Sequence, residues 1–388
     1  MTIAKGKKSA RLTIVSAIVL LLAACGSQAE PPTRGGGAQP QASGASHAGG
    51  TGGAQQPQTD AGASSEAGGT QSAGQEAKDT GATIYLYGND FVDFIAPKFM
   101  EATGFKMEAV HYGGGEALAK IEAEQGNPQW DVLKMDGHGS VRNLADRDFL
   151  LTGWKPDNLA KLSEQGKGYV PADLSYFPIG IHAAALIAYN TDKVPADKAP
   201  RTWEQFFAYD GPVGHADPAV AAPAYPLVSA FFERWGEPMA QKLYTQRFKD
   251  GLRVYPKNGP VGKALLSGEI HVAALQEHNA YELKLAGEPV EVVWPEEGAP
   301  GSLRVVAISK QAKNPAAAKA FVEFMLKPET QQMLTALDST DSFFTPLAEG
   351  VSARSEREPN GTFLLPTAEW AAEHEADIKT WFADQNIQ

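Results

Sequence analysis

Three turns of the sequence carry glycine where a helix would begin, which is an arrangement suited to binding an anion. They are residues 88–89, 113–115 and 258–260. The first turn of a helix has free N–H groups and about half a positive charge, which favour a phosphate or a carboxylate. Glycine lets such a ligand approach the backbone closely. The candidate ligand contacts are Asn89, Gly114, Asn258 and Gly259; the alternative is that these glycines only cap turns.

A second set of polar side chains follows predicted strands. Carboxylates stand at Asp136, Asp217 and Glu277, where they could pair with an amine or ligate a hard cation. Hydroxyl groups of the same loops or their neighbours, at Tyr112, Tyr225 and Ser140, could add hydrogen bonds to the ligand. Each carboxylate taken alone could equally be a helix cap or a solvated residue.

Three histidines on the same loops keep a metal site open as an alternative. They are His138, His215 and His278. Nitrogen ligands beside carboxylates can bind a transition metal. Each of these histidines could instead have a purely structural role.

Charge and missing motifs exclude several classes of protein. The chain of 388 residues has a formal net charge of −12, which argues against nucleic-acid binding, because phosphate neutralisation needs clustered Lys and Arg. Cys25 is the single cysteine, so an internal disulfide and a cysteine-based zinc site are excluded. The sequence has no HExxH or GxSxG motif, no phosphate-binding loop and no dinucleotide fingerprint. A surface hydrolase therefore stays a lower alternative.

Alternating strands and helices are predicted to position these residues. Apolar, β-rich runs at 83–87, 105–111 and 130–135 are separated by segments with helical spacing. This order is typical of a parallel sheet with helices on its faces, where ligands bind at the carboxyl ends of the strands. A second series has helices at 202–209, 225–235 and 260–266 and strands at 213–216, 252–255 and 270–275. Apolar runs at 179–189 and 303–308 predict two crossovers between the series, and further helices are expected at 316–326 and 367–382.

The N-terminus is typical of an exported protein. Basic residues precede an apolar stretch at 12–22, which is too short for a membrane span of about 20 residues. The motif Leu22-Ala23-Ala24-Cys25 looks like the lipobox of bacterial lipoproteins, and this resemblance implies cleavage after residue 24 and lipidation of Cys25. Residues 26–80 contain no Ile, Leu, Val, Met or aromatic residue, so we expect a disordered tether.

Motifs spread from about residue 83 to about residue 340 resemble the periplasmic solute-binding proteins of ABC importers. The matching segments are 112–115, 121–124, 126–132, 188–191, 202–203, 258–261, 266–269, 313–319 and 324–325. The most similar group contains ferric-ion, phosphonate, sugar-phosphate and thiamine binders, and polyamine binders are more distant. The resemblance implies a type II α/β fold in which two lobes, joined by a two-stranded hinge, close on a solute. It also implies a monomer without enzymatic activity or cofactor, which delivers its solute to permease and ATPase subunits.

The expected organisation follows from this resemblance. Residues 1–24 are the signal peptide and residues 25–82 the lipidated cysteine and its tether. Lobe 1 is expected to comprise residues 83–180 and about 303–336, and lobe 2 residues 190–300 and about 337–388. We expect the protein outside the cytoplasm, held to a bacterial membrane by its lipid.

One departure from the family bears on the solute. Ferric binders of this group carry adjacent tyrosines after the strand that here is 270–275, whereas this chain has no Tyr-Tyr pair. An organic solute with an anionic group, such as a phosphonate or a phosphorylated compound, is therefore favoured, and the acidic loop residues suggest that it also carries an amine. Iron and polyamines stay as alternatives.

Overall fold

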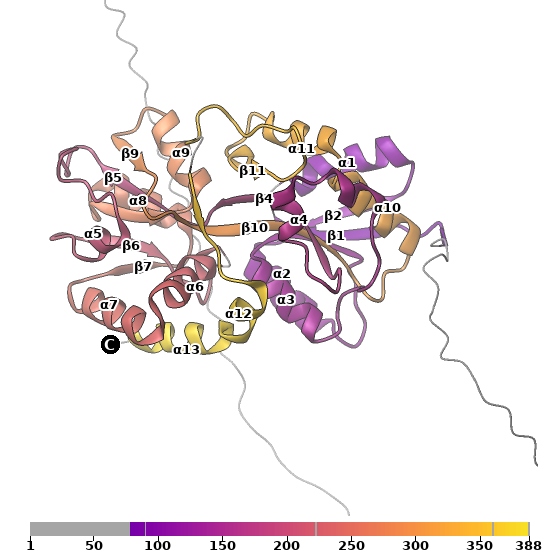
Figure 1. The fold of residues 1–388 in the computed structure, drawn as a ribbon, viewed down its shortest axis with the longest axis horizontal. Helices are drawn as coiled ribbons and strands as arrows, with labels where there is room; N and C mark the ends of the chain where they lie inside the picture. Colours follow the sequence, from indigo (N-terminus) through magenta and orange to yellow (C-terminus); the bar gives the residue numbers. More distant parts are fainter. Residues whose placement is uncertain (1–77, 90, 222, 359–360, 387–388) are drawn as a thin grey trace, which may run out of the picture. The chain divides into compact units, whose positions relative to one another are not determined.

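The computed structural model describes residues 78–89, 91–221, 223–358 and 361–386 (Figure 1). The predicted signal peptide, Cys25 and most of the predicted tether lie outside the described residues. Among the helices that are described, none has the length and apolar character needed to cross a membrane.

The first sheet has the strand order β11-β4-β10-β3-β1-β2, and β12 pairs with β10. β1 pairs in parallel with both β2 and β3, as the alternating pattern predicts. The strands are β1 (Ile84–Gly88), β2 (Met107–His111), β3 (Val132–Asp136), β4 (Tyr176–Ala183), β10 (Ala299–Ile308), β11 (Thr345–Pro346) and β12 (Phe363–Leu364). We call the part of the chain built around this sheet lobe 1.

Helices connect and cover these strands. They are α1 (Val92–Thr103), α2 (Gly114–Ala123), α3 (His138–Asp146), α4 (Glu164–Gly168), α10 (Pro315–Met325) and α11 (Pro328–Thr335), with short 3-10 helices η1 (Asp157–Lys161) and η2 (Thr340–Ser342). Apolar side chains at helical spacing turn one face of α1 and of α10 inward, so that Phe99 of α1 packs edge to face on Phe321 and Phe324. This burial holds both helices in place within lobe 1.

The second sheet has the order β7-β6-β8-β5-β9, and β6 is parallel to both β7 and β8. Its strands are β5 (Leu186–Asn190), β6 (Val213–Ala216), β7 (Arg253–Tyr255), β8 (Val272–Leu275) and β9 (Val290–Val293). Its helices are α5 (Trp203–Phe207), α6 (Ala224–Trp235), α7 (Glu237–Lys249), α8 (Asn258–Ser267) and α9 (Glu277–Leu285). We call this part lobe 2; α7, α9 and β9 have no counterpart among the elements predicted from the sequence.

Two crossovers join the sheets as a pair of neighbouring strands, which is the predicted two-stranded hinge. β4 of lobe 1 leads directly into β5 of lobe 2, and β9 of lobe 2 leads back into β10. β4 pairs antiparallel with β10, and β5 pairs antiparallel with β9. A small buried cluster lies at this junction and contains Ala183, Leu186, Tyr281, Ala299 and Phe343.

The C-terminal segment contributes to both lobes, whereas we expected residues 337–388 in lobe 2. β11 pairs with β4 and β12 pairs with β10, so both extend the first sheet. The predicted helix 367–382 is two helices, α12 (Ala368–Glu373) and α13 (Glu375–Asn386). α12 packs against α3 of lobe 1, and α13 packs against α6 and α7 of lobe 2. The physical reason is that apolar residues of this segment are buried in different clusters: Phe344 in the core of lobe 1 and Phe382 in the core of lobe 2.

Candidate functional site

A cleft of about 570 Å³ lies where loops of the two lobes meet at the carboxyl ends of the strands. This volume is within the usual range of small-molecule sites, about 300–1,000 Å³. Lobe 1 contributes the end of β1 and the start of α2, and lobe 2 contributes the starts of α6, α8 and α9. The lining residues are Asn89, His111, Gly113, Gly114, Gly115, Glu116, Val220, Ala221, Pro223, Lys257, Asn258, Gly259, Gln276, His278 and Asn279.

Helix starts dominate this lining. α2, α6, α8 and α9 all begin at the cleft, and none of them has a side chain that caps its first N–H groups. Among helices that begin elsewhere, α5 and α10 are capped by Thr202 and Asn314, whereas α3, α7 and α11 also lack a side-chain cap. The first N–H groups of a helix have no partner within it, so those of α2, α8 and α9 are available to a ligand, apart from Pro260, which has no N–H. α6 offers fewer, because the N–H of Ala224 donates to the carbonyl oxygen of Ala221 and Pro226 has no N–H. The arrangement concentrates hydrogen-bond donors and positive helix ends on one small volume.

Glycines keep these helix starts open. A Cβ built on Gly113 or on Gly259 would meet no atom within 4 Å, so the cleft is unobstructed there. A Cβ on Gly115 would lie 3.1 Å from the carbonyl oxygen of Val220, so the two lobes approach closely at that edge.

Side-chain amides of the cleft are oriented by hydrogen bonds. Lys134 Nζ lies 3.3 Å from the carbonyl oxygen of Asn89 and 3.4 Å from Asn89 Oδ1. In lobe 2, Asn258 Nδ2 donates to Gln276 Oε1 at 3.0 Å. Lys134 and Gln276 are both buried, so they hold the side-chain amides of Asn89 and Asn258 in defined positions.

Five of the residues singled out in the sequence line this cleft. They are Asn89, Gly114, Asn258, Gly259 and His278. Sequence reasoning missed His111, Glu116, Lys257, Gln276 and Asn279. Gln276 and Asn279 belong to the start of α9, and a prediction of that helix would have indicated them.

Tyr112 and Asp217 adjoin the lining without being part of it. The ring of Tyr112 packs edge to face on Tyr87, with ring centroids 5.1 Å apart. Asp217 Oδ1 accepts a hydrogen bond from the N–H of Ala219 at 2.8 Å, so this carboxylate closes the turn before α6. The structure thus gives both side chains local roles.

Asp136 lies in a buried group of charges instead of the cleft. Its Oδ1 is 3.3 Å from Arg304 Nε, and its Oδ2 is 3.3 Å from His182 Nε2. Burial would raise the pKa of Asp136, but Lys134, Arg304 and His182 together lower it well below its ordinary value. The carboxylate therefore neutralises neighbouring cations, which is a different task from the amine binding that we expected.

Glu277 is likewise held by the protein itself. Its carboxylate pairs with the guanidinium of Arg357 and accepts a hydrogen bond from the N–H of Ala183 at 2.8 Å. Arg357 also donates to Thr345 Oγ1 of β11 at 2.6 Å. Glu277 thus ties the start of α9 in lobe 2 to the crossover and to lobe 1, and it does not line the cleft.

Three further candidates contact the C-terminal segment. Ser140 Oγ donates to Glu375 Oε1 at 2.7 Å, and the hydroxyl of Tyr225 donates to the carbonyl oxygen of Ala371. His138 Nε2 lies 2.9 Å from the carbonyl oxygen of Pro366. Burial lowers the pKa of His138 and raises the pKa of Tyr225. Ser140 thus joins α3 to α13, His138 joins α3 to the segment before α12, and Tyr225 joins α6 to α12.

The three histidines of the metal alternative do not come together. His138 contacts the segment before α12, His278 lines the cleft, and His215 is buried in lobe 2 against Tyr244 and Phe382. Burial lowers the pKa of His215 to about 4, so it is a neutral core residue. Within the described part of the chain, no group of three His, Cys, Asp or Glu side chains is placed to hold a metal ion.

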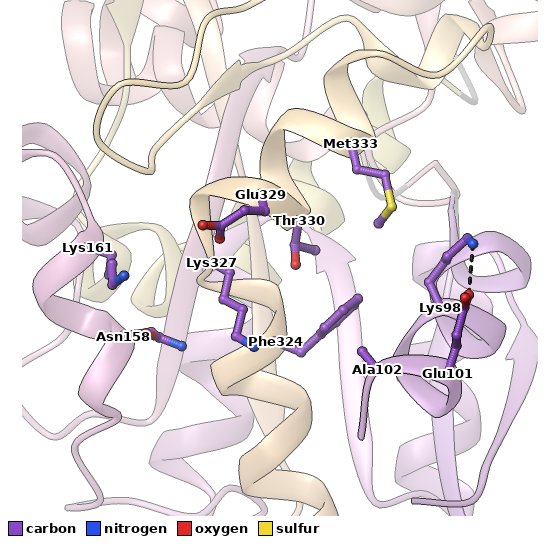
Figure 2. A pocket seen from close by; sticks show the side chains of 10 residues that line it. All are labelled: Lys98, Glu101, Ala102, Asn158, Lys161, Phe324, Lys327, Glu329, Thr330 and Met333. Atoms are coloured by element: carbon purple, nitrogen blue, oxygen red, sulfur yellow. Dashed lines mark hydrogen bonds and ion pairs between the residues drawn. The ribbon is translucent and has the colours of Figure 1, made fainter. Parts of the chain in front are cut away.

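A second hollow, of about 700 Å³, lies on lobe 1 alone (Figure 2). It is lined by residues of α1, η1, α10 and α11, among them Lys98, Lys161, Phe324 and Lys327. Lys98 already pairs with Glu101 at 2.9 Å, and both side chains are largely exposed. The hollow lacks the convergence of lobes and helix starts that marks the first cleft, so we assign it no ligand.

Comparison with known proteins now identifies the family. Residues 95–361 match the family model described as bacterial extracellular solute-binding protein. The chain belongs to this family. It is the solute-binding component of an ABC importer and acts outside the cytoplasm, as its sequence motifs predicted.

Curated relatives are consistent with this assignment. An uncharacterized protein of Haemophilus influenzae is 29% identical over 251 residues, which are 61% of this chain and 69% of the relative. A putative 2-aminoethylphosphonate-binding periplasmic protein of Salmonella typhimurium is 22% identical over 303 residues, 73% of this chain and 84% of the relative. The spermidine/putrescine-binding periplasmic protein of Escherichia coli is 29% identical over 104 residues, and the match spans 27% of this chain and 29% of that relative.

Solved structures share the fold. Iron-bound HitA from Pseudomonas aeruginosa is similar with a TM-score of 0.68 at 22% identity, covering 78% of this chain and 99% of that one. AfuA from Actinobacillus pleuropneumoniae, with fructose-6-phosphate bound, is similar with a TM-score of 0.69 at 21% identity, covering 78% and 98%. These likenesses confirm the two-lobe α/β fold that the sequence predicted.

Proposed function

We propose that this solute-binding protein captures a small organic anion carrying a phosphonate or phosphate group and delivers it to the permease and ATPase of its importer. One observation carries the proposal: four uncapped helix starts, from both lobes, line a single cleft. A phosphoryl group has enough acceptor oxygens to bind several of these N–H groups at once. Lys257 and His111 add cationic or donor side chains at the rim.

The same lining argues against a polyamine. A cation needs carboxylates or aromatic faces, and the lining residues include one carboxylate, Glu116, and no Phe, Tyr or Trp. The carboxylates that we expected to receive an amine, Asp136, Asp217 and Glu277, have other partners. An amine is therefore not part of this proposal, although Glu116 offers a place for one.

Two comparisons support the anionic class. One relative is named a putative 2-aminoethylphosphonate-binding protein, and one solved neighbour holds fructose-6-phosphate. Iron is less well supported, because the chain has no Tyr-Tyr pair and the described residues hold no metal cluster.

The proposal includes a lipid anchor at Cys25, which rests on the lipobox-like motif before it. The monomeric state is likewise part of the proposal. Replacement Cys25→Ser should abolish incorporation of labelled palmitate in the expressing bacterium, and labelling that persists would contradict the anchor.

A thermal-shift screen tests the solute class. The panel contains phosphonates, including 2-aminoethylphosphonate, sugar phosphates, spermidine, amino acids and Fe³⁺. A ligand present at a hundredfold excess over its Kd stabilises the folded state by about 2.7 kcal/mol. We expect saturable stabilisation by a phosphonate or a phosphate ester and none by spermidine or Fe³⁺. Stabilisation by spermidine alone, or by Fe³⁺ alone, would overturn the proposal.

A further inference from the structure

The amide of Asn89 has one orientation only. Lys134 Nζ can donate but cannot accept hydrogen bonds, and it lies beside Asn89 Oδ1. The oxygen of the Asn89 amide must therefore face Lys134, and its Nδ2 is left for the cleft that Asn89 lines. From lobe 1 this side chain thus presents a hydrogen-bond donor, next to the free N–H groups at the start of α2.

The amides of lobe 2 present a different pattern. Asn258 and Gln276 use one amide atom each to bind one another. Asn258 Oδ1, an acceptor, and Gln276 Nε2, a donor, are then left for the cleft. Exchanging oxygen and nitrogen in both amides would again leave one acceptor and one donor. The lobe 2 side of the cleft therefore offers both kinds of group whichever assignment holds.

A phosphoryl oxygen and a hydroxyl differ in the hydrogen-bonding groups that they can bind. An ionised phosphoryl oxygen only accepts, so it suits the donor of Asn89 and the free N–H groups of the helix starts in either lobe, and not an amide oxygen. A hydroxyl both donates and accepts, so it satisfies an acceptor and a donor that stand side by side. We infer that the solute carries a hydroxyl group bound by Asn258 and Gln276, and that its anionic group lies between Asn89 and the helix starts of the cleft, an inference that rests on the proposed function.

Burial makes this pair selective. Gln276 is 3% exposed, so a solute that closes the cleft without a hydroxyl leaves amide atoms without water and without a partner. A site built to bind a hydroxyl rejects an analogue that lacks it far more strongly than a pocket rejects a missing methylene group.

Matched ligand pairs test the inference by isothermal titration calorimetry on the full chain. Glycerol 3-phosphate is compared with propyl phosphate, and sorbitol 6-phosphate with hexyl phosphate, so that only the hydroxyl groups differ within a pair. In at least one pair the hydroxylated member should bind at least tenfold more tightly.

Three variants assign the effect to residues. Gln276→Met should remove the preference for the hydroxylated member, so that the two members of each pair bind within about twofold of one another. Asn89→Asp keeps an oxygen for Lys134 but replaces the donor Nδ2 with an oxygen, so both members of a pair should bind at least tenfold more weakly. Gln241→Met is the matched control and should bind like the parent chain, because Gln241 is a half-buried glutamine of α7, bonded to Glu237 and outside the cleft lining. Asn258→Ala, at a half-buried position, replaces Gln276→Met if that variant does not fold.

The outcomes separate the two proposals. Equal affinities within both pairs would overturn the hydroxyl inference and leave the anion site standing. A preference that survives both Gln276→Met and Asn258→Ala would also overturn it. If none of the four compounds binds but other phosphates or phosphonates do, the hydroxyl inference fails and the proposed function stands. If no phosphate or phosphonate binds, both the proposed function and the hydroxyl inference fail.

Discussion

The carboxylate of Glu277 is buried between a guanidinium and a backbone N–H of the crossover. Removing one partner of such a pair leaves the other charge buried without compensation, which typically costs about 3–5 kcal/mol. We expect Glu277→Ala to lower the free energy of unfolding by this amount, because Arg357 would lose its counter-charge. Urea denaturation followed by circular dichroism measures it.

A second ion pair of the same segment is the control. Arg354 pairs with Glu356, but these side chains are 22% and 35% exposed. Partly exposed pairs are typically worth about 1 kcal/mol or less, so Glu356→Ala should change the unfolding free energy little. Similar losses in the two variants would contradict the structural role that we assign to Glu277.

The buried imidazole of His215 predicts a dependence of stability on pH. Burial lowers its pKa in the folded state to about 4, from 6.5 in the unfolded chain. The unfolded chain therefore takes up a proton first as the pH falls, so the contribution of this group to stability is complete above pH 6.5 and is lost between pH 6.5 and 4. The difference corresponds to about 3 kcal/mol.

Denaturation at a series of pH values measures this loss. In His215→Gln, which cannot be protonated, the decrease in unfolding free energy between pH 6.5 and 4 should be smaller than in the parent chain. Parallel curves for the two proteins would mean that His215 is not the titrating group.

Predicted ligand contacts were wrong where the side chain has a hydrogen-bond or ion-pair partner far away in the sequence. The position of Glu277 after a strand is visible in the sequence, but its partner Arg357 is 80 residues away. The glycine-bearing turns were more informative, because the chemistry of a helix start is local. Gly114, Asn258 and Gly259 accordingly line the cleft, whereas the three predicted carboxylates do not.

At the scale of elements, the start of α8 offers a direct test of backbone access. A side chain at Gly259 would stand in open space at the cleft and cover the N–H groups of this helix start. Gly259→Val should therefore weaken binding of the phosphorylated solute at least tenfold, while the melting temperature of the free protein changes little. Titration calorimetry and thermal melting measure the two effects.

Gly126, in the turn after α2, provides the comparison. A Cβ there would also meet no atom within 4 Å, but Gly126 does not line the cleft. Gly126→Val should bind solute like the parent chain. If Gly259→Val also binds the solute like the parent chain, the solute does not bind at the start of α8.

The elements that the sequence indicates are those with a strong pattern. Strands β1 to β3 and helices α1, α2 and α10 have apolar residues at the spacing of their own geometry. The structure contains the three strands and α10 close to the predicted bounds, and α1 and α2 between the strands as predicted. α7 and α9 were missed because charged and polar residues cover most of their surface; α7 buries only Ala240, Tyr244 and Arg247. The split between α12 and α13 was also missed, since a single helical pattern runs through both.

For the whole molecule, two lobes on a two-stranded hinge predict closure around the solute. Spin labels at exposed positions on different lobes, Ala119→Cys and Lys263→Cys, would report the distance between α2 and α8 in a Cys25→Ser background. Saturating phosphorylated solute should shorten this distance and narrow its distribution in pulsed electron resonance. A distribution that is the same with and without bound solute would exclude hinge closure.

The hydrogen bonds of residues 79 and 80 determine where a mechanical force on the N-terminal part of the chain would enter the fold. Asp79 Oδ1 accepts a hydrogen bond from Asn314 Nδ2, and Thr80 Oγ1 donates to the carbonyl oxygen of Lys313, so the chain enters beside the first residues of β1. Asn89 and the cleft lie at the other end of that strand. With a lipid at Cys25, tension from the membrane would enter lobe 1 at this point and pass through neither crossover. Force on the proposed anchor would then do no work on the hinge, and the free energy of the predicted closure would be the same with and without the anchor.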